Sequence, residues 1–379
     1  MMLGAYMLRK FIVPALILLS AGGYGGCGGG VAASSSSGGT NLDPSNYGQN
    51  AKAAVVTLQT WYSQSTGIYA SPSGWWNAAN SITVLANYAR FTGDTSYNSV
   101  LANTFTAAQR SHANFINSYY DDQLWWALAW IDAYDLTSNA SYLSMAETIF
   151  ANVAANGWDT TTCGGGVWWN TAEKSKNTIP NELFLKTAAE LANRTSGTAS
   201  AGYLSWAQKE WDWIKGSGMI NSQSLINGTD STNPNPCNYG GAIWTYNQGV
   251  ILGGIVELYR ADQDPTLLPE AEAIAGAAIS NLSVNGILTE RVNLSGGDLP
   301  QFKGIFMRNL MELYQAVPAT STQASQYRKF VEANAQSIWT NDRTSGNELG
   351  GLWQGPFDSA DATRQTSALD ALIAADAMQ

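Results

Sequence analysis

Histidine is almost absent from this chain, since His112 is the only one among 379 residues. A zinc site with several histidine ligands, a paired-histidine acid/base mechanism and a Ser-His-Asp triad away from His112 are therefore excluded. We expect His112 itself to lie in an outer helix, as a surface or hairpin residue. Acid/base chemistry is left mainly to carboxylates, and no metal or cofactor is expected.

Charge is also scarce, because only 13% of the residues are charged. Acidic residues outnumber basic ones by 29 to 19, for a net charge of -10. This balance argues against a nucleic-acid partner, which requires clustered Lys and Arg, but it is compatible with a neutral polysaccharide. The 15 Trp and 17 Tyr supply flat rings that stack on sugars, although such rings equally fill protein cores.

The N-terminus lacks an apolar run long enough to span a bilayer comfortably. Arg9 and Lys10 precede the short apolar run 11–19, and small residues follow. Residues 1–27 therefore resemble a signal peptide, and residues 28–47 a flexible Gly/Ser-rich tether. Cys27 lies where a lipidated cysteine would lie, but Tyr24-Gly25-Gly26 before it is a poor lipobox. Simple secretion and membrane attachment through a lipidated Cys27 both stay open, and we expect an exported protein, secreted or held at the cell surface or in the periplasm.

Only two further cysteines, Cys163 and Cys237, follow in the chain. In an exported protein such a pair favours a disulfide, and two reduced, buried thiols are the alternative.

Alternating β-branched runs are missing too, and from residue 48 onward the apolar spacing is helical. It predicts helices at 48–65, 76–92, 96–117, 121–135, 140–155, 178–195, 199–216, 244–261, 266–281, 300–316, 321–340 and 359–377. Residues 124–131 are apolar all round and should be buried, whereas 321–340 have a polar face and should lie outside. An even number of helices with these two characters predicts an all-α domain, 48–379, built as an (α/α)6 barrel of six hairpins. Long loops at 156–177, 217–243 and 282–299 would form its mouth.

The strongest chemical signal is the adjacent pair Asp121-Asp122, which opens the apolar helix between aromatic residues. Acids at a helix start are ordinary partners of the helix dipole, and that is the alternative reading. Two such acids near a barrel axis cost desolvation and repulsion, so a fold retains them more readily when they are used. Retaining glycosidases need two close carboxyls, a nucleophile and an acid/base. We expect the charge of Asp121 to raise the pKa of Asp122 and keep it protonated as the acid, with the two titrating as a pair.

Six motifs in order resemble glycoside hydrolase family 76. They are Trp75 to Asn80 (WWNAAN), Tyr120 to Trp130 (YDDQLWWALAW), Cys163 to Asn170 (CGGGVWWN), Lys176 to Phe184 (KNTIPNELF), Trp244 to Gly249 (WTYNQG) and Phe302 to Gly304 (FKG). The resemblance covers roughly residues 50 to 375. It implies an (α/α)6 barrel and retaining endo-cleavage of α-1,6-mannan without a metal, with Asp121 as nucleophile and Asp122 as general acid/base.

The resemblance also nominates residues that line the sugar groove or support its mouth: Trp75, Asn77, Asn80, Trp126, Trp169, Asn177, Asn181, Tyr246, Asn247 and Lys303. One departure is Asn227-Gly228, where relatives carry Asp-Gly. The fungal branch of the family implies transglycosylation at cell walls as an alternative to hydrolysis, and a non-catalytic mannan-binding surface protein is a third reading. The expected partner is an α-mannan or mannooligosaccharide, bound by a monomer.

Overall fold

The computed structural model describes residues 42–172, 175–230, 232–290, 294 and 297–379. The predicted signal peptide 1–27, Cys27 and the tether up to residue 41 lie outside the described residues. No helix in the described part is both long and apolar enough to cross a membrane.

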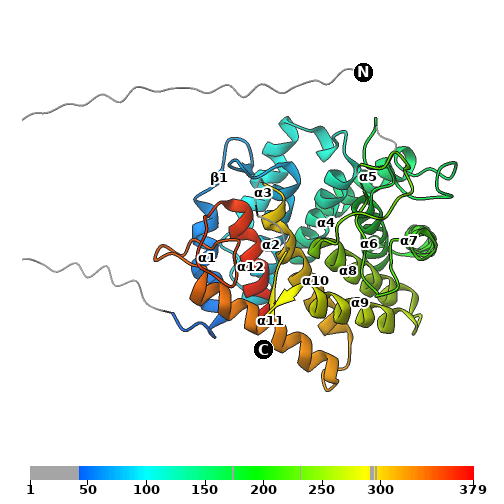
Figure 1. Cartoon of the computed structure of the whole chain (residues 1–379). Coiled ribbons are helices and arrows are strands. Elements are labelled where there is room, and N and C mark those ends of the chain that lie inside the picture. Colours follow the sequence, from blue (N-terminus) through cyan, green and yellow to red (C-terminus); the bar gives the residue numbers. More distant parts are fainter. Residues whose placement is uncertain (1–41, 173–174, 231, 291–293, 295–296) are drawn as a thin grey trace, which may run out of the picture. The chain divides into compact units, whose positions relative to one another are not determined.

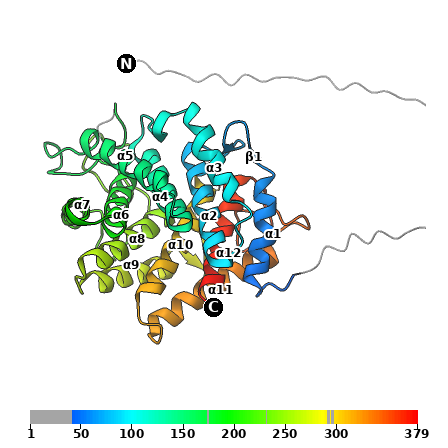
Figure 2. The same cartoon turned by 180° about the vertical axis from the view of Figure 1, so that it is seen from behind.

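The described residues form twelve α-helices, arranged as an all-α barrel. The helices are α1 (Tyr47–Gln59), α2 (Trp75–Thr92), α3 (Asn98–Ala107), α4 (Tyr120–Thr137), α5 (Ala140–Asn156), α6 (Thr178–Arg194), α7 (Gly197–Ser217), α8 (Thr245–Asp262), α9 (Leu267–Asn281), α10 (Phe302–Ala316), α11 (Thr322–Asn341) and α12 (Ala362–Ala377). The even-numbered helices form an inner ring in which each packs against the next, and α12 closes the ring onto α2. Figures 1 and 2 show the odd-numbered helices around them. The predicted (α/α)6 class is confirmed.

Sequence character accounts for the two rings. Inner helix α4 is buried at every position from Gln123 to Ile131, as its all-round apolar sequence predicts. Outer helix α11 buries a stripe at three- and four-residue spacing, including Tyr327, Val331 and Ile338. Because inner helices are covered on all sides, their polar side chains need internal partners.

Two predicted helices are too long. The helix expected at 48–65 ends at Gln59, and the chain turns into a hairpin of β1 (Tyr62–Ser63) and β2 (Ile68–Tyr69), with Tyr62 opposite Tyr69. The helix expected at 96–117 ends at Ala107 and gives way to two short 3-10 turns. Asn114 and Phe115 in the second turn have positive φ angles of 55° and 60°, which no α-helix contains.

His112 is consequently not in a helix. It lies half-buried between the two 3-10 turns, with its ring edge-on to Trp75 at 4.6 Å between centroids. A second small hairpin, which periodicity did not predict, joins β3 (Ser283–Val284) and β4 (Ile287–Leu288).

Two long loops at the start of α6 and α8 are tied together. Cys163 and Cys237 form a disulfide with Cα atoms 5.6 Å apart. Buried Lys176 reinforces the first loop by donating to the carbonyl oxygens of Asp159 (3.1 Å) and Gly166 (2.6 Å). Its backbone N–H donates to Pro236 O in the second loop. These ties hold the segment that carries Trp169 and Asn177.

Candidate active site

The adjacent acids lie in the first turn of inner helix α4, half-buried. Each carboxylate has its own donor from outside the helix. Asp121 Oδ2 accepts a hydrogen bond from Trp169 Nε1 at 3.0 Å, and Asp122 Oδ2 accepts one from Asn117 Nδ2 at 2.7 Å. The helix N-terminus also favours negative charge at this position, so the helix backbone and the two side-chain donors together stabilise the pair of acids.

Burial dominates the electrostatics of the pair. It raises the pKa of Asp121 to about 8, with repulsion from Asp122 as the second cause and the Trp169 hydrogen bond opposing. It raises the pKa of Asp122 to about 6, with the Asn117 hydrogen bond opposing and the charge of Asp298 adding to the rise. Both pKa values are raised, and the two acids repel each other and titrate as a pair, so the expectation that Asp122 carries the single proton stays a prediction.

A cavity of about 160 Å³ opens beside Asp121. Aromatic rings dominate its wall, and a third carboxylate faces it. The lining residues are Trp76, Asp121, Trp125, Trp169, Asn177, Ile179, Tyr246, Asp298 and Phe302. They come from inner helices α2, α4, α6, α8 and α10 and from the loops before α6 and α10.

The rings of the wall support one another. Tyr246 stacks on Phe302 with centroids 3.9 Å apart and an interplanar angle of 8°. Trp76 stacks on Trp125 at 5.7 Å, and its Nε1 donates to Asp298 Oδ1 at 2.8 Å. Asp298 is thereby held in place at the cavity. Flat rings with convergent acids and an amide suit a sugar, which has apolar C–H faces and a rim of hydroxyls.

Three of the nominated groove residues line this cavity, namely Trp169, Asn177 and Tyr246. Asn177 also caps α6, since its side chain accepts from Ile179 N. The other nominees lie outside the cavity wall: Trp75, Asn77, Asn80, Trp126, Asn181, Asn247 and Lys303.

Three of the four buried amides among these seven make hydrogen bonds that hold neighbouring segments in place. Asn77 accepts from Gly74 N at 2.9 Å and so fixes the start of α2. Asn80 accepts from the guanidinium of Arg308. Asn181 accepts from Val167 N at 2.6 Å and donates to Val167 O at 3.1 Å, which holds the disulfide-bonded loop on α6. Asn247 is also buried in α8.

The remaining three nominees belong to the core. Trp75 and Trp126 pack together at 4.8 Å in a cluster that includes Phe115. Lys303 is buried, donates to Gly351 O at 2.7 Å and lies over the ring of Trp353. Burial lowers the pKa of Lys303 to about 7.

Sequence reasoning missed five residues of the wall: Trp76, Trp125, Ile179, Asp298 and Phe302. Trp76 and Trp125 are the immediate neighbours of the nominated Trp75 and Trp126. Successive helical side chains point about 100° apart, so only one of two neighbouring rings faces the cavity. Asp298 had a weaker signal, as an acid at the end of a long loop close to the Phe302 motif.

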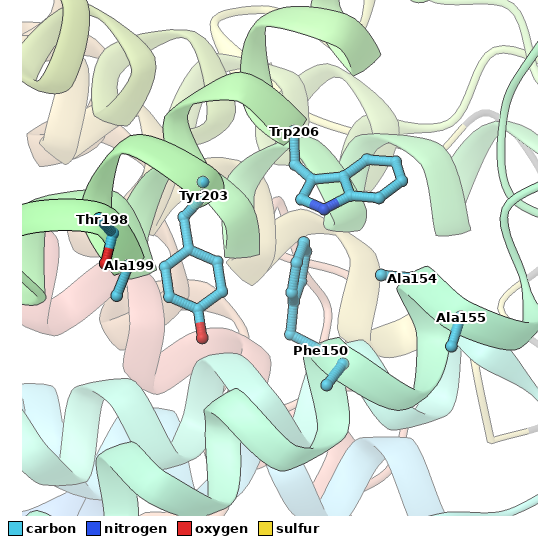
Figure 3. Close-up of a pocket in the computed structure, with 9 residues that line it drawn as sticks. Phe150, Ala154, Ala155, Thr198, Ala199, Tyr203 and Trp206 are labelled. Atoms are coloured by element: carbon cyan, nitrogen blue, oxygen red, sulfur yellow. The ribbon is translucent and has the colours of Figure 1, made fainter.

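A larger hollow of about 480 Å³ lies on the outer ring between α5 and α7 (Figure 3). Phe150, Tyr203 and Trp206 form its walls, and alanines and a glycine much of the rest. No carboxylate or amide lines it, so it lacks the acids found at the smaller cavity. The described residues also contain no cluster of three or more side chains able to hold a metal ion.

Comparisons with known proteins agree with this geometry. The family model described as glycosyl hydrolase family 76 matches residues 47–379. The chain is 27% identical over 371 residues to the mannan endo-1,6-alpha-mannosidase DCW1 of Saccharomyces cerevisiae, covering 88% of this chain and 80% of that protein. It is 27% identical over 346 residues to the mannan endo-1,6-alpha-mannosidase DFG5 of Candida albicans, covering 83% of this chain and 74% of that one.

Solved structures share the fold. One is an inactive variant of the alpha-1,6-mannanase GH76A of Salegentibacter sp. HEL1_6, in complex with alpha-1,6-mannotetrose, in which two adjacent aspartates are replaced by alanine. It superposes with a TM-score of 0.80 at 23% identity, covering 88% of this chain and all of that one.

Proposed function

The chain belongs to glycosyl hydrolase family 76, and from that premise we propose that it cleaves α-1,6-mannan internally, with retention, through a covalent glycosyl-Asp121 intermediate. The observation that carries the proposal is the pair Asp121-Asp122. The two acids have separate hydrogen-bond donors, and Asp121 lies in the wall of an aromatic cavity that fits a single sugar ring. The names of the relatives and the α-1,6-linked ligand of the solved neighbour support the choice of substrate.

The mechanism requires one proton on the pair. Between the two pKa values, about 6 and about 8, the pair holds a single proton, and the productive form has it on Asp122. The Trp169 N–H favours the anion at Asp121, and the negative charge of Asp298 favours the proton at Asp122. Trp169 and Asp298 therefore bias the pair toward the productive form, whereas the desolvation of Asp121 and the hydrogen bond from Asn117 to Asp122 oppose it.

In the first step an oxygen of ionised Asp121 attacks the anomeric carbon while Asp122 donates its proton to the departing glycosidic oxygen. The bond from the anomeric carbon to Asp121 forms as the glycosidic bond breaks. In the second step Asp122, now ionised, takes a proton from water, whose oxygen displaces Asp121 from the same carbon. Asp298, held by Trp76, is placed to accept a hydrogen bond from a ring hydroxyl of the bound sugar.

We further propose that residues 1–27 direct export and that the catalytic unit acts as a monomer. Lipidation at Cys27 is tested by Cys27→Ser. This variant moves a lipid-anchored enzyme from the membrane fraction into the medium and leaves the location of a simply secreted one unchanged.

The test of function is incubation of residues 40–379 with linear α-1,6-mannan, followed by chromatography of the products. The wild type should give a ladder of short mannooligosaccharides, and Asp121→Asn and Asp122→Asn should give none while remaining folded, as circular dichroism would show. Longer products on addition of an acceptor sugar would show transfer in place of hydrolysis. Binding to mannan without any new reducing ends would show a non-catalytic protein and refute the proposal.

A further inference from the structure

The cavity beside Asp121 is too small for the proposed polymer. About 160 Å³ accommodates roughly one sugar ring. An enzyme that cleaves inside a chain must also bind the sugars on either side of the broken bond, and these sugars lie beyond the cavity wall. Residues for them should be aromatic, exposed and continuous with the wall.

Tyr119 meets these three requirements. Its side chain is 40% exposed. Among the described residues four large hydrophobic side chains are exposed, and Tyr119 is the aromatic one; the other three are Val56, Val284 and Leu352. Its ring packs edge-on against Trp169, with centroids 5.5 Å apart and an interplanar angle of 62°. Trp169 in turn lines the cavity and donates to Asp121. An aromatic path therefore leads from Asp121 to the surface.

The backbone of Tyr119 is held firmly although its side chain is exposed. Its N–H donates to Asn117 Oδ1 at 3.0 Å, and the residue pairs with Asn170 as an antiparallel bridge. On either side, Tyr120 N donates to Trp169 O and Thr171 N donates to Ser118 O, each at 2.9 Å. The phenol hydroxyl makes no hydrogen bond to another described residue. Folding gains little from exposing such a ring, whereas a ligand can use a ring that is already positioned.

We propose that Tyr119 forms an outer subsite for a mannosyl unit next to the one held beside Asp121. The inference rests on the proposed function. The C–H face of the pyranose stacks on the exposed face of the phenol ring, and the hydroxyl bonds to a hydroxyl of the sugar. Because Tyr119 lies outside the cavity, it recognises chain length and leaves the chemistry at Asp121 unchanged.

The test measures binding in the Asp122→Asn background, where no turnover occurs. Calorimetry compares methyl α-mannoside, a single sugar that occupies only the cavity, with α-1,6-linked mannohexaose for Tyr119→Ala, Tyr119→Phe and the remote surface control Val56→Ala. Tyr119→Ala should weaken hexaose binding about tenfold and leave binding of the single sugar unchanged. Tyr119→Phe should retain most of the affinity because it keeps the ring, and Val56→Ala should match the parent.

Three results would overturn the subsite. Equal affinity of Tyr119→Ala and the parent for hexaose would show that the ring does not bind sugar. An equal loss for both ligands would show that Tyr119 only supports Trp169. If the folded Asp122→Asn parent binds neither ligand, the proposed substrate itself is wrong, and the subsite falls with it.

Discussion

Replacement of Trp169 by phenylalanine isolates one interaction of the acid pair. Phenylalanine keeps an aromatic ring against Tyr119 but cannot donate to Asp121, so the 3.0 Å hydrogen bond from Trp169 Nε1 is lost. That bond lowers the pKa of Asp121, and its loss must raise it. A hydrogen bond to a charged group contributes about 1.5–3 kcal/mol, which corresponds to a rise of about one to two pKa units.

The consequence for catalysis follows from the single proton on the pair. Each unit by which the pKa of Asp121 rises reduces the productive form, with Asp121 ionised and Asp122 protonated, about tenfold. We therefore expect kcat/KM on α-1,6-mannan to fall about 10- to 100-fold across its plateau. The basic limb of the pH profile should move to higher pH, because in the free enzyme it reports loss of the last proton from the pair, and a weaker acid at Asp121 makes that proton harder to remove.

The matched control is Trp168→Phe. The Trp168 ring lies over Lys176 Nζ at 4.1 Å and is not part of the cavity wall. This variant keeps the cavity wall and the hydrogen bond to Asp121, so it should change kcat/KM by less than about threefold and should leave the pH limbs in place. If Trp169→Phe loses activity with no shift of the basic limb, or if the control shifts it equally, the indole acts only through packing and the reasoning is refuted.

Three further predictions follow from the same structure. Asp298→Asn removes the charge that raises the pKa of Asp122. The acidic limb of the kcat/KM profile should therefore move to lower pH while activity falls. An unmoved limb would contradict an electrostatic effect of Asp298 on Asp122. Replacing Cys163 and Cys237 together by serine opens a loop with a sequence separation of 74. The chain-entropy model predicts that the free energy of unfolding falls by about 4 kcal/mol. An unchanged midpoint of denaturant unfolding would count against this. Burial raises the pKa of Glu290 from 4.5 to about 7, so the native state binds an extra proton and the wild type loses stability as pH rises through that range. Glu290→Gln should therefore gain stability relative to the wild type between pH values of about 5 and 8, by ~3 kcal/mol. A constant difference in melting temperature across that range would refute this prediction.

The fold was accessible from the sequence because its signal is local. Each helix carries its own apolar spacing, and the all-round apolar stretch in α4 distinguishes an inner helix from an outer one. The helix ends were less accessible. The sequence pattern predicts helix through Ser111 to Ile116, but α3 ends at Ala107. Positive φ angles at Asn114 and Phe115 exclude an α-helix there, and Phe115 is fully buried.

The candidate site was accessible only in part, for a different reason. The adjacent acids stand out along the chain, but the proton order between Asp121 and Asp122 depends on groups far away in sequence. Trp169 lies 48 residues from Asp121, and Asp298 reaches the site from the loop before α10. The same limit applies to Trp75 and Trp76, since only the packed structure shows that Trp76 faces the cavity and Trp75 the core.

The central claim is that Asp121 and Asp122 divide the work of a retaining reaction on α-1,6-mannan. Its most direct test is to react the enzyme with an activated 2-deoxy-2-fluoro-α-mannoside and to locate the trapped sugar by peptide mass spectrometry. The account predicts one sugar per protein, attached to Asp121, in the wild type and also in Asp122→Asn, because an activated leaving group needs no proton. A sugar attached to Asp122 or Asp298, or an unlabelled enzyme that releases a product of inverted configuration from natural substrate, would contradict it.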